Sequence, residues 1–352
     1  MDIFVLNQQF EIIDIIDNYE SLIWTDRYSA YGDFELWLPM QTYLLETLQK
    51  DNYLYIRESE HVMIIEDFEI TTDSEIGSRL AVTGRSLESI LTRRIVWGQK
   101  TYSGNVQTIV KKMINDAIIS PSISARKIAN FTFKETSDKS VNGESIEVQF
   151  TGDNLYESVC LLCNVVGAGF KITLDENNKF VFSLYSGDDR SYEQDDNPYV
   201  VFSPSFENII DSHYIETNSS YKNVTLVAGE GEGSNRKTLT VGSASGLARR
   251  EMFTDARDIS SKTQEGELTA AQYNAQLKER GNEYLSEYAA TTAFEGRAEA
   301  TRMFRYGEDF FMGDIVQIVN EFGMESRAHI TEIIRSQSES GLEIYPTFET
   351  IV

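Results

Sequence analysis

The sequence predicts a mainly β protein with α+β insertions, and three observations support this. Short runs of alternating apolar residues, separated by turns rich in Asp, Asn and Gly, occupy residues 1–100. The same pattern returns after residue 199, and several stretches between the two regions show helical spacing instead. The hydrophobic content of 41% and the aromatic content of 11% are those of an ordinary globular protein, so we expect a sizeable buried core.

The stretch 21–39 reads SLIWTDRYSAYGDFELWLP and predicts two strands around a turn. Its apolar residues recur at every second position, as in a strand with one buried face. These residues are Leu22 and Trp24, then Phe34, Leu36 and Leu38. Gly32 can take the positive φ that a tight turn often requires, and Pro39 ends the second strand because it cannot donate to a ladder.

The rest of residues 1–100 adds short strands and little helix. We expect a short helix at 41–49 and another at 86–94, the latter with Ser86 as its N-cap. Short strands joined by tight turns are typical of a small antiparallel barrel or sandwich. The expected strands are 3–6, 11–16, 22–28, 34–38, 53–57, 62–71 and 79–83.

The spacing of apolar residues changes after Tyr102 and predicts a compact α+β insert. We expect helices at 105–119, ended by Pro121, and at 153–166, ended by Gly167. The remaining expected elements are an exposed loop at 135–144, a hairpin of strands 170–174 and 180–185, and an acidic exit loop at 187–198.

The last part of the chain predicts a second all-β unit and one long helix. The helix spans 269–288, with Thr269 as its N-cap, and its interior Gly281 indicates close packing at that point. The expected strands are 199–202, 207–216, 223–228, 237–241, 293–300, 315–320, 327–335 and 342–347.

The formal net charge of −25 argues against nucleic-acid binding, which depends on Lys and Arg. Plain solubility is the default explanation of such a charge. Acidic residues occupy the place of a signal peptide's basic region, and no apolar run approaches the length of a membrane span. We therefore expect folding in a cytoplasm and no membrane segment.

No residue is expected to be catalytic or to bind a cofactor or metal. Gly229-Glu-Gly-Glu-Gly233 lacks phosphate-loop spacing, and its glutamates would repel phosphate. Asp255 and Asp258, interleaved with arginines, indicate a salt-bridged corner. Cys160 and Cys163 indicate two buried thiols on a helix, since no set of zinc ligands lies near them.

Sequence alone leaves one enzymatic alternative open, because acidic residues are abundant throughout the chain. No G-x-S-x-G or H-E-x-x-H motif occurs, but two suitably spaced carboxylates could still form a glycosidase site. The alternative function is therefore a β-rich cell-wall or carbohydrate hydrolase, or an adhesin.

Five segments in order along the chain carry a recognisable pattern. They are W-T-D-R-Y followed by G-D-F-E-L-W-L-P at 24–39, G-R-S-L-E-S-I-L-T-R-R at 84–94, A-G-E-G-E-G at 228–233, D-A-R-D at 255–258, and G-D-I-V at 313–316 with A-H-I-T-E-I at 328–333. Together they resemble phage and prophage tail-hub proteins of the siphovirus Gp37-like family, which is similar to the N-terminal hub part of tail-associated lysins.

The resemblance implies two similar β-barrel domains and two smaller inserted domains. The first barrel would span 1–100, completed by strands around 199–220, with the α+β insert at 101–198. The second barrel would comprise 221–260 and 290–352, and the helical insertion 261–289. The sequence ends at Val352, directly after the last expected strands, so we expect no lytic domain.

The resemblance also implies a homotrimeric, six-fold-like ring in a virion tail made in the bacterial cytoplasm. Its expected partners are further copies of itself, a distal tail or tail-tube protein, and a spike, fibre or lysin protein. Phage DNA would pass through the ring without specific binding, and an acidic inner wall would repel its phosphates.

Three aromatic residues are candidates for an interface: Trp24, Trp37 and Tyr31. Large aromatic residues often anchor interfaces, although packing in the core accounts equally well for each of them. Trp37 points opposite to its neighbours Leu36 and Leu38, so we expect it at least partly on an intersubunit or interdomain surface.

Overall fold

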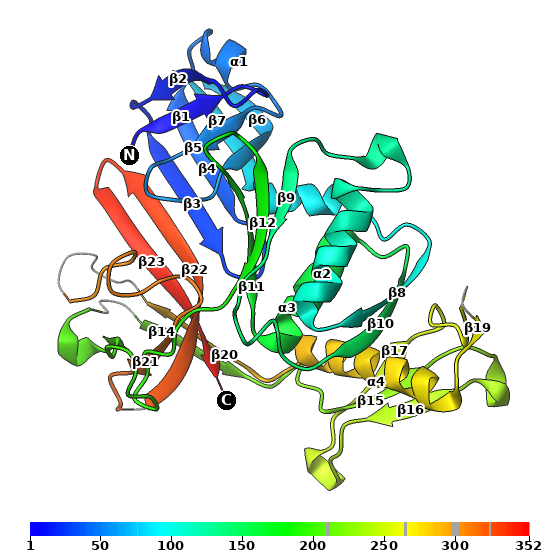
Figure 1. Ribbon diagram of the computed structural model, residues 1–352. Helices are drawn as coiled ribbons and strands as arrows, with labels where there is room; N and C mark the ends of the chain where they lie inside the picture. Colours follow the sequence, from blue (N-terminus) through cyan, green and yellow to red (C-terminus); the bar gives the residue numbers. More distant parts are fainter. Residues whose placement is uncertain (76, 209–211, 264–265, 297–302, 324, 352) are drawn as a thin grey trace. The chain divides into compact units, whose positions relative to one another are not determined.

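The computed structural model describes residues 1–352 except 76, 209–211, 264–265, 297–302, 324 and 352 (Figure 1). The chain folds into two compact units. Unit 1 comprises Met1–Ile90, Gly169–Ile215 and Thr292–Val352, and unit 2 comprises Leu91–Ala168 and Glu216–Thr291. The described part is mainly strand with a few helices, which confirms the predicted fold class.

Unit 1 is built on one branched sheet of 13 strands. Its main path runs β14-β20-β23-β22-β3-β4-β7-β6-β5-β1-β2, and β21 joins β22 on a side branch together with β13. The strands are β1 Ile3–Leu6, β2 Ile12–Ile16, β3 Ser21–Arg27, β4 Asp33–Pro39, β5 Tyr53–Tyr55, β6 Met63–Asp73, β7 Gly77–Ser86, β13 Val201–Phe202, β14 Ser212–Thr217, β20 Thr291–Gly296, β21 Ile315–Val319, β22 Glu325–Ser338 and β23 Gly341–Ile351.

Other elements of unit 1 are a hairpin and short helices. The hairpin of β11 (Gly169–Leu174) and β12 (Phe180–Tyr185) pairs as predicted. The predicted helix at 41–49 is one turn, α1 (Leu44–Thr47), and the predicted helix at 86–94 is a 3-10 helix, Leu87–Arg93.

Two apolar cores lie on different parts of the sheet of unit 1. The first contains Leu22, Trp24 and Leu36, which the two-residue alternation of β3 and β4 places on one face. The second surrounds Phe202 and Phe348. The long strand β22 connects the two parts, because it pairs with β21 near its start and with β3 near its end. Closure of each part into a barrel, and the division into four domains, stay predictions.

In the described residues of unit 2, three helices have two turns or more, and a polar side chain caps the start of each. Asn105 and Asn154 cap α2 (Val106–Ile114) and α3 (Leu155–Val166) by accepting from Thr108 N and Tyr156 N. Thr269 forms a capping box with Gln272 at the start of α4 (Ala270–Glu287). A π-helical turn, Asn115–Ile119, follows α2.

Most strands of unit 2 form small sheets with one another. In one of them, apolar side chains of β15 and β16 pack against Tyr273 and Leu277 of α4. A Cβ at Gly281 would lie 2.7 Å from Val241 and 2.8 Å from Val227, which confirms the close packing predicted there. The strands are β8 Gln99–Gly104, β9 Phe131–Lys134, β10 Ile146–Thr151, β15 Val224–Ala228, β16 Thr238–Val241, β17 Glu251–Asp255, β18 Lys262–Thr263 and β19 Gly266–Glu267.

Several strand predictions differ from the structure. The sequence analysis predicts no strand at β8, β9, β10, β17, β18 or β19. The strand predicted at 207–216 overlaps β14, and its residues 209–211 lie outside the described residues. The strand predicted at 293–300 overlaps β20, and its residues 297–300 lie outside the described residues.

Candidate functional site

Arg27 holds the loop between β3 and β4 in place. Its guanidinium contacts Asp33 Oδ2 at 2.6 Å, the Tyr31 carbonyl at 3.1 Å and Glu332 Oε1 at 2.5 Å. The first two contacts close the loop, and the third ties it to β22. These residues of the W-T-D-R-Y and G-D-F-E segments therefore have a structural role.

Two glycines of the motif segments allow backbones to approach each other. A Cβ at Gly32 would lie 2.1 Å from Thr25 O, and one at Gly84 would lie 1.8 Å from Ile64 O. Gly32 is not among the residues with positive φ, so the expected reason for this glycine was wrong. The actual reason is close packing, and the Gly32 N–H donates to Ser86 Oγ at 2.7 Å.

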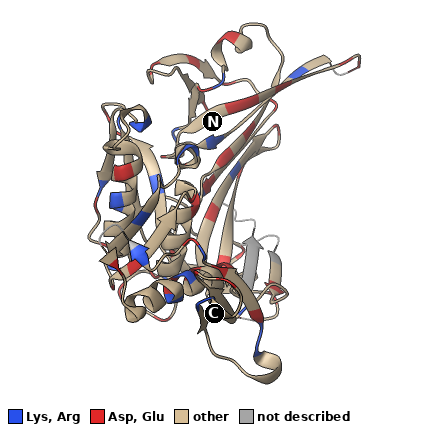
Figure 2. Cartoon of the chain, turned by 90° about the vertical axis from the view of Figure 1, so that its right-hand side faces the viewer, with Lys and Arg blue, Asp and Glu red and all other residues tan. Residues whose placement is uncertain are grey.

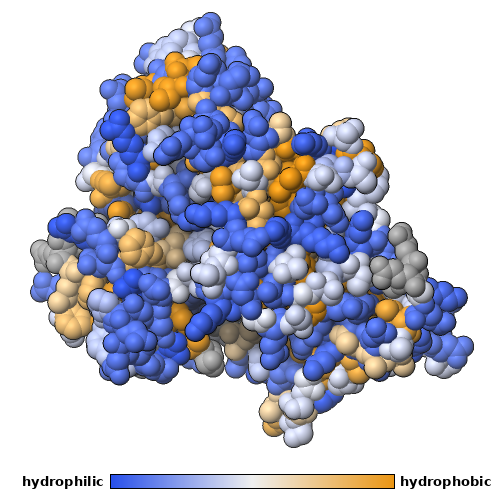
Figure 3. All heavy atoms as spheres, in the orientation of Figure 1, coloured by the Kyte–Doolittle hydropathy of each residue, from blue (hydrophilic) through white to orange (hydrophobic). Residues whose placement is uncertain are grey.

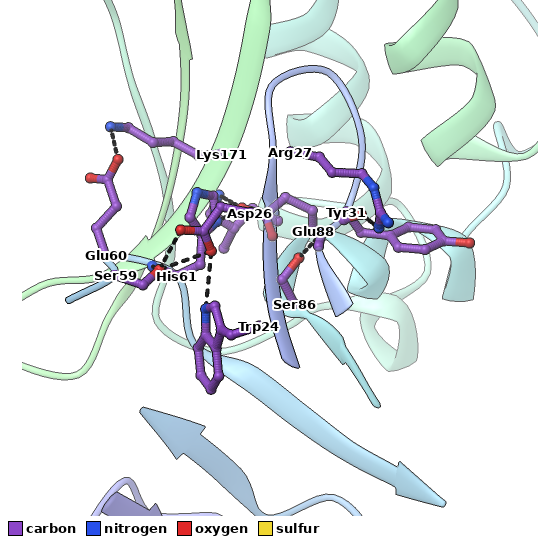
Figure 4. A network of polar contacts seen from close by, with 12 residues as sticks. Trp24, Asp26, Arg27, Tyr31, Ser59, Glu60, His61, Ser86, Glu88 and Lys171 are labelled. Atoms are coloured by element: carbon purple, nitrogen blue, oxygen red, sulfur yellow. Dashed lines mark hydrogen bonds and ion pairs between the residues drawn. The ribbon is translucent and has the colours of Figure 1, made fainter. Parts of the chain in front are cut away.

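A buried polar network centres on Asp26 (Figure 4). The carboxylate of Asp26 accepts from Trp24 Nε1 at 3.1 Å and from Ser59 Oγ at 2.9 Å. Arg335 completes the network with a buried ion pair of 2.6 Å to Asp26. The network thus connects β3, the loop before β6, and β22. A buried charge pair of this kind needs such additional hydrogen bonds to offset its lost hydration.

His61 and Glu88 form a second buried ion pair beside Asp26. His61 Nδ1 lies 3.0 Å from Glu88 Oε1, which also accepts from the Ile172 N–H at 2.7 Å. Burial alone would lower the pKa of His61, but the carboxylates of Glu88 and Asp26 outweigh it and raise that pKa to about 9. His61 is therefore charged at neutral pH.

The arrangement around His61 does not form a hydrolytic triad. The hydroxyl of Ser59, two residues before His61, donates to Asp26 and not to the imidazole (Figure 4). Ser59, His61 and Glu88 are all buried, so substrate cannot reach them. The geometry indicates a device that joins segments of unit 1.

The G-D-I-V segment packs around an aromatic corner. The ring of Tyr28 lies edge-on to Tyr185 at 5.2 Å and to His329 at 4.7 Å. A Cβ at Gly313 would lie 2.3 Å from the Tyr28 ring, so only glycine fits there. Asp314 binds Arg190 Nε at 2.7 Å in a largely buried pair. These motif residues are again structural.

The acidic motif residues of unit 2 are paired with cations. Asp255 contacts Arg257 at 2.6 Å and also pairs with Arg236, while Asp258 contacts Arg280 at 2.9 Å. This is the salt-bridged corner that the sequence predicts. Glu230 accepts from Lys237 Nζ at 2.9 Å and from the Ser261 N–H at 3.1 Å. The glutamate of the glycine-rich hairpin thus binds neighbouring protein groups.

The strand register places acidic residues on the outer face of the unit 1 sheet, where Arg27, Arg79 and Arg85 also lie. Two of these carboxylates are paired with cations, Glu332 with Arg27 and Asp67 with Lys50. Glu35 lies opposite Thr83, which lies opposite Asp67, and Glu69 lies opposite Ala81. These side chains point away from the first core, as do those of Glu332 and Glu343. Figure 2 shows red segments spaced along these long strands. We call Glu35, Asp67, Glu69, Glu332 and Glu343 the acidic face.

The charge of the chain is divided unequally between the units. Unit 2 holds 18 of the 56 acidic and 18 of the 31 basic residues, so its formal charges cancel. The other 38 acidic and 13 basic residues belong to unit 1, which therefore carries the whole net charge of −25. Composition alone could not reveal this division, because the two units alternate along the chain.

The structure separates the three aromatic residues predicted at an interface. Trp24 is fully buried in the first core, so the folded single chain offers none of its surface to a partner. Trp37 is half-buried on the acidic side of the sheet and donates to Glu35 at 2.7 Å. Tyr31 is half-buried beneath Arg85, at 4.9 Å. An interface role for these residues stays a prediction.

Exposed apolar residues gather on the terminal strand β2 of the main sheet path. Ile12, Ile13 and Ile15 are 60%, 42% and 52% exposed. Figure 3 shows the corresponding orange area over the N-terminal strands. Exposed edge strands of this kind are the usual sites of pairing with another chain.

Of the two cysteines predicted to be buried thiols, Cys163 is buried and Cys160 is partly exposed. Burial raises the pKa of the Cys160 thiol to about 12 and that of Cys163 well above its usual value, so both remain thiols. Within the described residues, no three His, Cys, Asp or Glu side chains gather in a way that could hold a metal ion. No helix in that part of the chain is long and apolar enough to span a bilayer.

Comparison with known proteins agrees with the resemblance. The profile of the family called Siphovirus ReqiPepy6 Gp37-like protein matches residues 2–348. A search of curated proteins found no match.

Three solved structures share the fold over nearly the whole chain. The 43 kDa tail protein of prophage MuSo2 from Shewanella oneidensis has a TM-score of 0.59 at 12% identity, covering 99% of this chain and 98% of its own. Prophage tail protein gp18 from Listeria monocytogenes has a TM-score of 0.57 at 13% identity, covering 99% and 94%. The tail protein from Neisseria meningitidis has a TM-score of 0.56 at 13% identity, covering 99% and 96%.

Proposed function

Because the chain belongs to the family of Siphovirus ReqiPepy6 Gp37-like proteins, we propose that it is a structural hub of a phage or phage-like tail. Family membership over residues 2–348 is the observation that carries this proposal. The contacts of the motif residues support it, since those residues close loops and join strands. A role without enzymatic activity, in the virion tail, follows from the same reasoning.

We propose further that three copies form a ring. The supporting feature is an open edge of the sheet. Strand β5 pairs with β6 only at Met63 and Ile64, so in the described residues the rest of β6 pairs with β7 alone. Phe68 and Ile70 on that open part are 43% and 44% exposed. An exposed edge with apolar side chains is suited to pairing with a neighbouring copy.

The acidic face then lines the passage for DNA. Carboxylates along a wall repel phosphates, so DNA can move past them without being held. The concentration of the net charge in unit 1, on whose sheet this face lies, supports the assignment.

The ring would join a distal tail or tail-tube protein on one side to a spike, fibre or lysin protein on the other. The exposed isoleucines of β2 are a surface suited to one of these partners, because binding a neighbour would remove their apolar area from water. In this role the protein is made in the bacterial cytoplasm and becomes part of the virion.

The experiment that tests the ring is a mass measurement by light scattering after size exclusion, at several protein concentrations. We expect a trimer of the 40.0 kDa chain. Electron microscopy of the trimer peak should then show rings with a central opening. A chain that stays monomeric at every concentration, and stays so when mixed with its tail-tube protein, would contradict the ring.

A further inference from the structure

One part of unit 2 is strongly basic, although the chain as a whole is acidic. Between residues 93 and 134, Asp116 is the single acidic residue. We call the basic residues of this segment the basic band: Arg93, Arg94, Lys100, Lys111, Lys112, Arg126, Lys127 and Lys134. Figure 2 shows blue segments gathered around the helices of unit 2.

Three members of the band share two pockets, which Asp116 and, in the second pocket, Glu147 also line. Lys100 and Arg126 line one pocket of about 210 Å³, and Lys100 and Lys112 line the next. Arg94 Nε donates to the Arg126 carbonyl at 3.2 Å, and the Arg126 guanidinium donates to the carbonyl of Ile95, the residue after Arg94. Burial and the charges of Arg126 and Arg93 lower the pKa of Arg94, as expected where cations gather.

Several charges of the band are not neutralised within the chain. Lys100 and Lys127 are exposed, and neither has a carboxylate partner in the described part of the chain. Lys111, by contrast, pairs with Glu135. Lys100 and Lys127 therefore keep positive charge on the surface of a unit whose formal charges cancel.

An exposed aromatic residue lies within the band. Trp97 is 54% exposed, and the guanidinium of Arg126 lies 5.2 Å from the centre of its ring. Tryptophan and arginine are the residue types most enriched among the energetic centres of protein interfaces. The combination favours a protein partner over DNA, which the net charge of −25 repels.

Unit 1 carries a loop with the complementary composition. Asp195 and Asp196 are exposed, and Tyr192 and Tyr199 beside them are 49% and 43% exposed. The two tyrosine rings meet edge-on at 5.5 Å, and the Tyr199 hydroxyl donates to Asp195. Elsewhere in the loop, Asp189 and Glu193 already pair with Arg327, so Asp195 and Asp196 keep their charge available.

We propose that the basic band of one copy binds residues 192–199 of a second copy. The band offers cations around an exposed tryptophan, and the loop offers carboxylates between exposed tyrosines. Two different surfaces of the same chain generate a head-to-tail contact, which closes into a ring when the rotation between copies permits. The proposal rests on the proposed ring and names one contact that holds it.

The test is a charge exchange between the two surfaces. The band variant Lys100→Glu/Lys127→Glu changes two exposed side chains that form no ion pair in the described part of the chain, so we expect it to fold normally. It should raise the concentration for half-assembly by roughly tenfold or more in light scattering. Adding Asp195→Lys/Asp196→Lys to the band variant should restore assembly, because the signs of both surfaces are then reversed.

The matched control is Lys262→Glu/Lys278→Glu, which makes the same charge change at exposed positions of unit 2 outside the band. It should assemble like the wild type. If the band variant assembles as the wild type does, the proposed contact is refuted, although the ring itself stands. If the band variant fails to assemble and the added loop substitutions do not restore assembly, residues 192–199 are not what the band binds. If the wild type never assembles, both the ring and the contact are overturned. If the wild type binds duplex DNA and the band variant does not, the band binds nucleic acid and not a second copy.

Discussion

At the residue scale, the motif segments are explained by burial and close packing. Gly32, Gly84 and Gly313 each stand where a side chain would overlap a neighbouring group. Asp26 and Glu88 are buried carboxylates, and each contacts a buried cation. Removing one member of such a pair leaves a charge without its partner, which costs far more than losing a surface ion pair.

Gly84→Ala should destabilise unit 1 severely, because the added Cβ would lie 1.8 Å from the Ile64 carbonyl oxygen and 2.9 Å from Phe34. We expect a loss of roughly 3 kcal/mol or more in the free energy of unfolding. Gly143→Ala is the matched control, since its Cβ would meet ordinary contacts at 3.6 and 3.7 Å. Equal urea midpoints for the two variants would contradict the packing argument.

The His61–Glu88 pair should make stability depend on pH. His61 has a pKa of about 9 in the folded chain against 6.5 when unfolded, so its contribution is complete below pH 6.5 and is lost as pH rises through 9. The expected decrease in the free energy of unfolding over this range is roughly 3 kcal/mol. Urea titrations at pH 6, 7.5 and 9 would measure it.

The double variant His61→Gln/Glu88→Gln should lose this decrease, because neither side chain then titrates. His329→Gln is the control. Burial lowers the pKa of His329, so this residue changes the free energy of unfolding only below pH 6.5. The decrease in the free energy of unfolding toward pH 9 should therefore persist in this variant. An unchanged slope in the double variant would assign the pH dependence to other groups.

At the element scale, β22 is the strand that joins the two parts of the unit 1 sheet. It pairs with β21 and β23 and, through residues 332–338, with β3. The ion pair between Arg335 and Asp26 lies inside this pairing, with both side chains at most 3% exposed. Its loss should therefore weaken the junction between the two cores.

Arg335→Met should cost about 3–5 kcal/mol of unfolding free energy, since Asp26 would stay buried without its cation. The double variant Asp26→Asn/Arg335→Met should recover a large part of that loss, because no buried charge is left. Thermal unfolding of the wild type, both single variants and the double variant gives the coupling energy directly. Purely additive effects would mean that the pair does not act as a unit.

At the scale of the whole molecule, charge is the property that the fold organises. All of the net negative charge belongs to unit 1, while unit 2 combines balanced totals with a basic band. In the proposed hub, the acidic face would repel DNA, and the basic band would bind the next copy. Electrostatic forces would then repel DNA from unit 1 and attract a second copy to unit 2.

Reversing the acidic face should create affinity for DNA. The variant Glu35→Lys/Asp67→Lys/Glu69→Lys should retain a fluorescent duplex in a binding assay at low salt and release it as salt rises. The wild type should retain none. The matched control Asp2→Lys/Glu46→Lys/Glu176→Lys makes the same charge change at exposed positions of unit 1 away from this face. Equal retention of the duplex by both variants would show that DNA binding depends on the net charge of the protein and not on this face.

The sequence by itself determined the local elements and the family. Alternation in 21–39 predicted β3 and β4, Thr269 predicted the start of α4, and the ordered motifs predicted the family that the profile confirms. These features depend on residues close together in the chain, so a linear reading detects them. The strand β10 was missed, although its residues Ile146–Thr151 carry β-branched and aromatic side chains.

Only the tertiary structure decided which distant residues meet. The network around Asp26 draws Ser59 and Arg335 from other segments, and the second pair draws His61 to Glu88. No spacing rule predicts such contacts, because they depend on how strands far apart in sequence pair. The division of charge has the same cause: each unit is assembled from separate pieces of the chain, so its total exists only once the chain is folded.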